Sequence, residues 1–162
     1  MIKAIKTFVE STDEKSLIAF GASPYSVKEG RLITREEIDS VCPDRPMMLV
    51  KYDGHACVVN TPLLKKLEKK LSKLRGYHPE SGEMNQEAFF AVSDYISNSV
   101  SIPQMIRNMQ KAVDYEASKG IGMIHTVSGV GFPLSADITI EKLFAKSVQH
   151  GFQIRELLQN NE

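Results

Sequence analysis

Hydrophobic residues along the chain form two kinds of pattern, short uninterrupted runs and longer stretches with a helical period. A short apolar run bounded by Gly or Pro is typical of a buried strand. Apolar residues three or four positions apart are typical of an amphipathic helix. Strands are therefore expected at 17–20, 47–50, 121–127 and 152–155. Helices are expected at 2–9, 61–74, 86–96, 102–119 and 139–150, and a further short helix is expected between Thr34 and Pro43.

Three of the predicted helices begin at residues that cap helix N-termini. Thr34 and Glu37 have the spacing of a capping box, in which the hydroxyl accepts a backbone N–H and the carboxylate reaches back to the cap residue. Pro43 must end that short helix. Asn60 and Ser101 are cap residues that each stand two positions before a proline, which is favoured in the first helical turn.

The last third of the chain reads helix, strand, helix, strand with short connections. This order is typical of parallel β/α units, whose sheet is buried on both faces and either closes as a barrel or stays open. Two or three such units cannot close a barrel alone. Segments 76–82 and 129–133 are expected to be loops. The sequence predicts an α/β fold with a mixed or parallel sheet flanked by helices, and one compact domain.

Charge and composition exclude several classes of protein. Twenty basic residues balance twenty acidic ones, which argues against a nucleic-acid binder. The lysine-rich segment 63–75 is interpreted as a solvated helix face. No apolar run approaches the length that a membrane span needs. Cys42 and Cys57 are too few for a disulfide framework and are interpreted as buried apolar residues of a cytoplasmic protein.

Motifs that carry known chemistry are missing from the sequence. The four histidines, at 55, 78, 125 and 150, include no pair with the spacing of metal ligands. There is no nucleophile elbow and no phosphate-binding loop. Gly129 and Gly131 form a lone G-x-G that is interpreted as a turn, because Pro133 blocks the helix that a nucleotide loop requires.

Two histidines stand where α/β proteins build sites. His55 follows the predicted strand 47–50 in the sequence Tyr52-Asp53-Gly54-His55, and Asp53 could orient its imidazole. A purely structural turn histidine is the other interpretation. His125 lies near the end of the strand 121–127, where a barrel would face its active site. Its other interpretation is a core histidine with its hydrogen bonds satisfied.

Four segments together resemble a known family. They are LIAFG at 17–21, ITREEIDSVCPDRP at 33–46, YDGHACVVNTPLL at 52–64 and ASKGIGMIHT at 117–126. In this order they resemble the metal-dependent amidohydrolase family that includes the N-substituted formamide deformylases. The resemblance extends from about residue 17 to residue 155, and the combination is more specific than any one segment.

The resemblance implies a metal-bearing (β/α)8 barrel with a small β-sandwich and an insertion after the first barrel strand. Residues 1–100 would be an insertion-like region, and 101–162 would be early β/α units of an incomplete barrel. The family's metal-binding histidines and final aspartate would lie outside this chain. A divalent metal, zinc for such a family, would therefore belong to the full-length enzyme. By the same resemblance, Asp53, His55 and His125 are candidates for the wall of the substrate pocket, and no residue is assigned a catalytic role.

Three hypotheses about function follow from these observations. The first is a fragment of a metal-dependent hydrolase that acts on amide-type C–N bonds of a small molecule and is inactive alone. The second is a stand-alone, non-catalytic α/β binding or regulatory module. The third is a small independent enzyme with His55 as general acid or base and Asp53 behind it.

An incomplete barrel would also leave apolar strand edges open. Open edges invite pairing between molecules. The sequence therefore predicts a homodimer, or a rearranged C-terminal strand that covers the edge.

Overall fold

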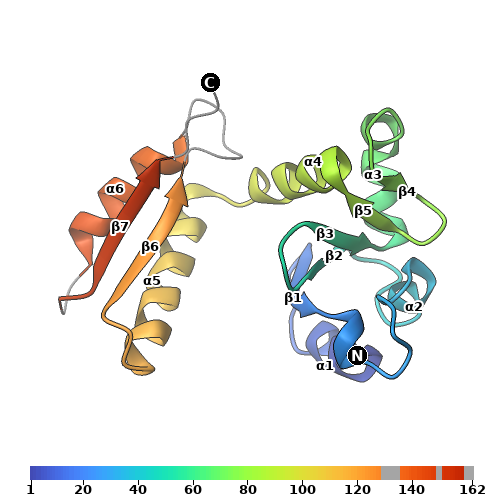
Figure 1. The fold of residues 1–162 in the computed structure, drawn as a ribbon, viewed down its shortest axis with the longest axis horizontal. Helices are drawn as coiled ribbons and strands as arrows, with labels where there is room; N and C mark the ends of the chain where they lie inside the picture. The colour runs from blue at the N-terminus through green and yellow to red at the C-terminus, as the bar shows by residue number, and fades with distance from the viewer. Residues whose placement is uncertain (129–135, 149–150, 159–162) are drawn as a thin grey trace. The chain divides into compact units, whose positions relative to one another are not determined.

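In the computed structural model the chain forms two compact units, Met1–Ser93 and Asp94–Glu162. A five-stranded mixed sheet is the centre of the first unit. The structure describes residues 1–128, 136–148 and 151–158. Strand order in this sheet is β1-β2-β3-β5-β4; β1 and β2 are parallel and the other pairs are antiparallel (Figure 1). The elements of the chain up to the end of this unit are α1 (Ile2–Glu10), β1 (Leu17–Ala22), the 3-10 helix η1 (Pro24–Ser26), α2 (Arg35–Asp39), β2 (Met47–Lys51), β3 (Ala56–Val59), α3 (Thr61–Leu71), β4 (Tyr77–His78), β5 (Glu83–Asn85) and α4 (Gln86–Ser97), whose last turn belongs to the second unit.

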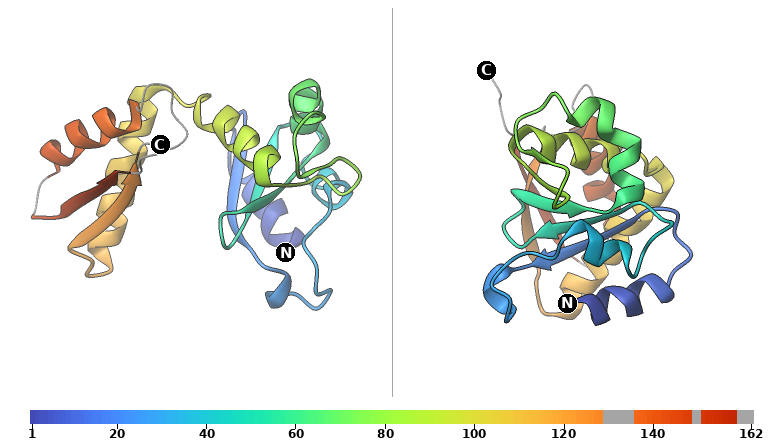
Figure 2. Two further views of the ribbon diagram at one scale, coloured as in Figure 1. Left: turned by 45° about the horizontal axis from the view of Figure 1, so that its top comes forward. Right: turned by 90° about the vertical axis from the view of Figure 1, so that its right-hand side faces the viewer.

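Strands β2 and β3 form the centre of the sheet because both are apolar along nearly their whole length. All of β3 is buried, and so is β2 up to its last residue. Since successive side chains of a strand point to opposite faces, such strands must be covered on both sides. Helices α1 and α2 lie on one face, and α3 with the first part of α4 lies on the other (Figure 2). On the α1 and α2 side, Leu49 and Val58 pack with Ile38 in one core cluster.

The side chain of Asn60 joins three segments of this unit. It is fully buried, and its Oδ1 accepts from the backbone N–H of Met47 at 2.8 Å and of Leu63 at 3.3 Å. Its Nδ2 donates to the carbonyls of Cys42 at 2.8 Å and Arg45 at 2.7 Å. The predicted helix cap at Asn60 is therefore confirmed, and the same amide also fixes the loop before β2.

The guanidinium of Arg45 holds α1 beside the sheet. It donates to the carbonyls of Val9, near the end of α1, and of Thr12, and at 3.2 Å to the carbonyl of Glu14. The carbonyls at a helix C-terminus have no partner within the helix, and a cation there is favourable. Arg45 therefore satisfies the end of α1 from the same loop that Asn60 fixes.

A parallel pair of strands with two helices forms the second unit. It contains α5 (Ile102–Ser118), β6 (Met123–Ser128), α6 (Ala136–Ser147) and β7 (Gln153–Leu158). β6 and β7 are parallel and paired in register from Met123 with Gln153 to Ser128 with Leu158. Phe144 of α6 packs against Val113 of α5 in a small core. The predicted parallel β/α unit is confirmed; the loop expected at 129–133 lies outside the described residues.

The structure differs from the sequence prediction at the far side of the first sheet. Segment 76–82 was expected to be a loop, but Tyr77 and His78 form β4, which pairs with β5. Glycine permits this hairpin, because a Cβ at Gly76 or Gly82 would collide with the backbone carbonyl of Asn85 or of Val59. β3 was missed as well, since a four-residue apolar run directly after a turn gives little periodicity.

Two helices show details that the sequence did not predict. Helix α3 ends at Leu71 rather than about Leu74. In α5 the apolar residues form one stripe along the helix, and within it Ile102 and Ile106 are exposed while Val113 is buried. The stripe is therefore covered only over its C-terminal part within the described residues.

Replacing Asn60 by Ala is expected to lower the free energy of unfolding by about 3 kcal/mol, because two backbone amides and two carbonyls lose their buried partner. Urea denaturation followed by circular dichroism measures the change. Asn98→Ala, at an exposed position, is the control and should change stability by less than about 0.5 kcal/mol. A loss below about 1 kcal/mol for Asn60→Ala would contradict the assigned role.

Candidate functional site

The turn between β2 and β3 carries Asp53 and His55 at the surface. It is closed by the N–H of Gly54, which donates to the carbonyl of Lys51 at 2.9 Å. The Oδ1 of Asp53 accepts from the backbone N–H of His55 at 3.2 Å. Both side chains are exposed to solvent. The two predicted pocket residues therefore lie together on one tight turn.

The carboxylate of Asp53 has a lysine as its charged partner. Its Oδ2 lies 2.8 Å from the Nζ of Lys51. The hydrogen bond with Lys51 holds the pKa of Asp53 below its ordinary value, and the bond with Asp53 raises the pKa of Lys51. Asp53 thus bonds to the backbone N–H of His55, and among the described residues no hydrogen bond joins its carboxylate to the imidazole.

Two exposed tyrosines stand beside this turn. The rings of Tyr25 and Tyr52 are 6.3 Å apart in an edge-to-face arrangement, and the Nζ of Lys51 lies 5.6 Å from the Tyr52 ring. Tyr25 belongs to η1. Ser23 caps the N-terminus of this helix, because its hydroxyl accepts the N–H of Tyr25. Since β1 and β2 are parallel, their carboxyl ends meet at the same edge of the sheet, which is where α/β proteins place ligands. Tyr25 was not predicted as a site residue, although Ser23 and Pro24 directly after a strand signal such a turn.

His125 lies in the second unit, on the exposed face of β6. Met123, His125 and Val127 are exposed, whereas Ser128, on the alternate face, is buried. In the register of the parallel pair, His125 is beside Arg155 of β7. His125 is therefore not a core histidine. It belongs to a different unit from Asp53 and His55, and His150 lies outside the described residues.

Glu141 of α6 makes a polar cluster with two hydroxyl groups at the end of β6. Its Oε2 accepts from the hydroxyl of Thr126 at 2.8 Å and of Ser128 at 2.5 Å. A cavity of about 210 Å³ adjoins this cluster and is lined mainly by apolar residues of α5, β6, α6 and β7. The contacts fix α6 to the strand. This cluster was not predicted, although Thr126 and Ser128 are two positions apart on one face of a strand.

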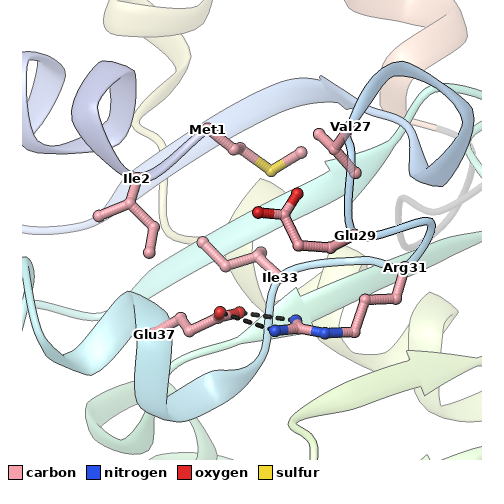
Figure 3. Close-up of a pocket in the computed structure, with 7 residues that line it drawn as sticks. All are labelled: Met1, Ile2, Val27, Glu29, Arg31, Ile33 and Glu37. Carbon is pink, nitrogen blue, oxygen red and sulfur yellow. Dashed lines mark hydrogen bonds and ion pairs between the residues drawn. The ribbon is translucent and has the colours of Figure 1, made fainter.

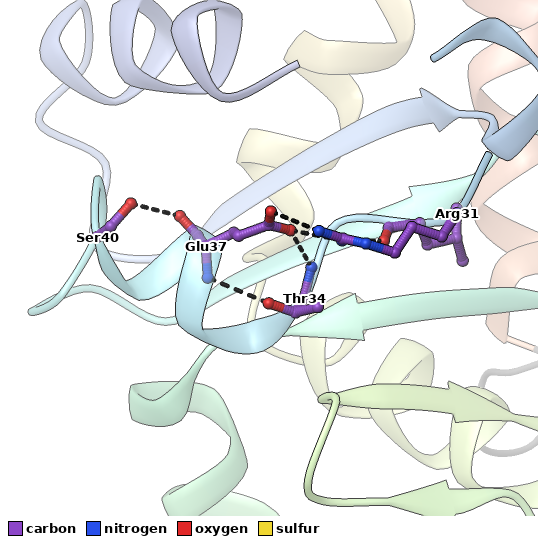
Figure 4. Close-up of polar contacts among 5 residues, drawn as sticks. Arg31, Thr34, Glu37 and Ser40 are labelled. Carbon is purple, nitrogen blue, oxygen red and sulfur yellow. Dashed lines mark hydrogen bonds and ion pairs between the residues drawn. The ribbon is translucent and has the colours of Figure 1, made fainter. Parts of the chain in front are cut away.

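A smaller cavity of about 60 Å³ lies beside an ion pair in the first unit (Figure 3). Both terminal guanidinium nitrogens of Arg31 donate to the carboxylate of Glu37 at 2.8 Å. Glu37 also accepts the N–H of Thr34 at 2.8 Å, while its own N–H donates to the Thr34 hydroxyl at 3.4 Å (Figure 4). The predicted capping box is therefore confirmed. These bonds lower the pKa of Glu37 to about 2, first through Arg31 and then through Thr34.

Glu37 is expected to make stability depend on pH in the acid range. Its pKa falls from an ordinary 4.5 to about 2 on folding, so its contribution is complete above about pH 5 and is lost as the pH falls toward 2. The difference in free energy of unfolding between the wild type and Glu37→Gln should therefore shrink over that interval. Urea titrations at several pH values measure it. Glu80→Gln, at an exposed position, is the control; a difference constant with pH would contradict the prediction.

The residues that the structure describes do not fit a catalytic metal or a thiol nucleophile. Among residues 1–128, 136–148 and 151–158, no three His, Cys, Asp or Glu side chains come together as a metal would require. Cys42 and Cys57 are unpaired and buried, and burial raises the pKa of Cys57 to about 12 and also raises that of Cys42.

No helix within residues 1–128, 136–148 and 151–158 is long and apolar enough to cross a membrane.

Comparison with known proteins finds the same fold in two solved structures. An uncharacterized metal-dependent hydrolase from Pyrococcus horikoshii OT3 is 13% identical with a TM-score of 0.63, and the match covers 97% of this chain and 30% of that one. One from Pyrococcus furiosus is 16% identical with a TM-score of 0.62, covering 97% of this chain and 32% of that one. No family model and no curated protein matches the chain. The chain thus shares the fold of about a third of each hydrolase.

Proposed function

We propose that this chain is part of a metal-dependent hydrolase that acts on amide-type C–N bonds of a small molecule. In this proposal it supplies an insertion and early β/α units, and other parts of the enzyme supply the ligands of a divalent metal. Zinc is the metal we expect. When bound, such a metal supplies a hydroxide nucleophile at neutral pH. The chain by itself is then inactive.

One pair of observations carries the proposal. The matches cover nearly the whole of this chain, yet they cover only about a third of each metal-dependent hydrolase. Within the described residues, no group of side chains is suited to hold a metal. A piece of such an enzyme that lacks its metal ligands has both properties. The resemblance of segments 33–46 and 52–64 to amidohydrolases supports the narrower reaction class.

Asp53, His55 and His125 are proposed as parts of the substrate pocket rather than as catalytic residues. Asp53 and His55 are exposed at the carboxyl edge of β1 and β2, a position that favours ligand contact. Tyr25 and Tyr52 add apolar rings at the same edge. His125 is exposed on a strand of the parallel β/α unit. The unpaired cysteines support a reducing, cytoplasmic location.

A stand-alone binding or regulatory module is the second candidate. The exposed tyrosine pair favours it, since exposed aromatic rings are common at binding surfaces. The genomic locus distinguishes the two candidates. A longer reading frame that encodes an H-x-H segment before residue 1 supports the hydrolase, and a longer frame without one excludes it.

The purified chain is expected to contain almost no zinc, iron or manganese after dialysis, as measured by elemental analysis. It should also fail to hydrolyse N-substituted formamides with or without added Zn²⁺. A value of about one tightly bound metal per chain, as in a formed catalytic site, would overturn the proposal. Amide hydrolysis that is lost in His55→Ala, and kept in the control His78→Ala, would instead favour an independent enzyme.

A further inference from the structure

Helix α3 carries its positive charge on one side. At about 100° per residue, its lysines fall within an arc of about 140°, and its buried leucines form the side that faces the sheet. Glu68, the acidic residue of the helix, lies outside the lysine arc. The exposed lysines of the helix, together with the lysine just after it, form the α3 lysine face, which consists of Lys65, Lys66, Lys69, Lys70 and Lys73.

Neighbouring side chains do not balance the charge of the α3 lysine face. Among the ion pairs in the part of the chain that the structure describes, none involves these lysines. Lys65 and Lys69, four positions apart, repel each other, as do Lys66 and Lys70, and such pairs destabilise a helix slightly. A helix face that is only solvated commonly alternates the signs of its charges. Because the whole chain has no net charge, this face is a local concentration of positive charge that folding does not require.

Further folded protein is a poor cover for this face. Lysine ammonium groups are strongly hydrated and are almost never buried without a partner. The cores of protein interfaces are depleted of lysine in the same way. Permanent packing of more polypeptide, such as the rest of a longer hydrolase, would have to remove water from all the ammonium groups of the face. The α3 lysine face therefore suits a partner whose own charges stay hydrated.

We propose that the α3 lysine face binds the surface of an anionic lipid membrane. A layer of anionic headgroups attracts each nearby lysine without demanding a fixed geometry. Nucleic acids instead favour arginine forks and stacked aromatic rings, and the helix, TPLLKKLEKKL, has neither. Acidic protein surfaces likewise favour arginine, which binds carboxylates through two parallel bonds and is enriched at interfaces.

The position of α3 in the first unit allows this contact. α3 lies in the layer that covers one face of the sheet, and α1 lies on the other face (Figure 2). A helix is about 10 Å across, and the Debye length is about 10 Å at 0.1 M salt. Charges beyond the sheet are therefore screened from a membrane that α3 touches. Because the apolar side of α3 is buried, the contact is electrostatic and reversible. The proposal is independent of the proposed function.

Sedimentation with phosphatidylcholine vesicles that contain about a third phosphatidylserine, in about 0.1 M KCl, tests the proposal. The chain is expected to sediment with these vesicles and to stay in solution with pure phosphatidylcholine vesicles. Lys66→Glu combined with Lys70→Glu should weaken binding at least about tenfold, because two charges of the face are reversed. The matched control is Lys3→Glu combined with Lys6→Glu on α1, which changes the net charge equally and should alter binding less than about twofold.

Measurements on the wild type test the contact without any variant. Raising KCl to about 0.5 M should release the chain from the vesicles. An acetylating reagent should label the lysines of α3 more slowly when vesicles are present, and Lys3 at an unchanged rate. No sedimentation with anionic vesicles, equal sedimentation with neutral ones, or an equal loss in both double variants would overturn the proposal. Tighter binding to single-stranded RNA or to a glutamate-rich peptide that depends on the same lysines would also overturn it.

Discussion

The buried amide of Asn60 is the interaction on which the arrangement of the first unit depends. Its oxygen and nitrogen together bind the start of β2, the first turn of α3 and the loop that follows α2. An amide can do this because it both accepts and donates, whereas a hydroxyl or a carboxylate of similar size could not satisfy all four groups. The loop fixed in this way includes Arg45, whose guanidinium holds the end of α1. One polar side chain thus sets the positions of both helical layers relative to β2.

The position of the candidate site follows from how β2 ends. β2 is buried on both faces until Lys51, where the chain leaves the covered layer and must satisfy its own polar groups in a turn. The bonds of Asp53 with Lys51 and with the N–H of His55 meet that requirement. They also expose His55 and bring Tyr52 beside Tyr25. The same bonds therefore stabilise the turn and expose these side chains. A substitution at this edge can change stability and ligand binding together, and the two effects must be measured separately.

Local signals predicted much of this structure, and the failures have a common physical reason. The caps at Thr34, Asn60 and Ser101 depend on neighbours in sequence, and all three formed. The β3, β5 and β4 ladder depends on pairing between distant segments and on glycines that allow close approach, so neither periodicity nor composition revealed it. At the site, the position of Asp53 and His55 on a turn was predictable from the sequence, but the pairing of Asp53 with Lys51 was not. Asp53 binds Lys51, two residues before it on the same turn, and the backbone N–H of His55.

Three carboxylates of the chain share a property that bears on its chemistry. The carboxylates of Glu37, Asp53 and Glu141 bind Arg31, Lys51 and two hydroxyls respectively. Each such contact is favourable in the folded state and would be lost if the carboxylate had to accept a proton or bind a metal. A general base or metal ligand must instead be held near its target with lone pairs to spare. These acidic groups are consequently suited to hold elements in place, and at the carboxyl edge of β1 and β2 the carboxylate of Asp53 holds the turn beside which Tyr25, Tyr52 and His55 are exposed.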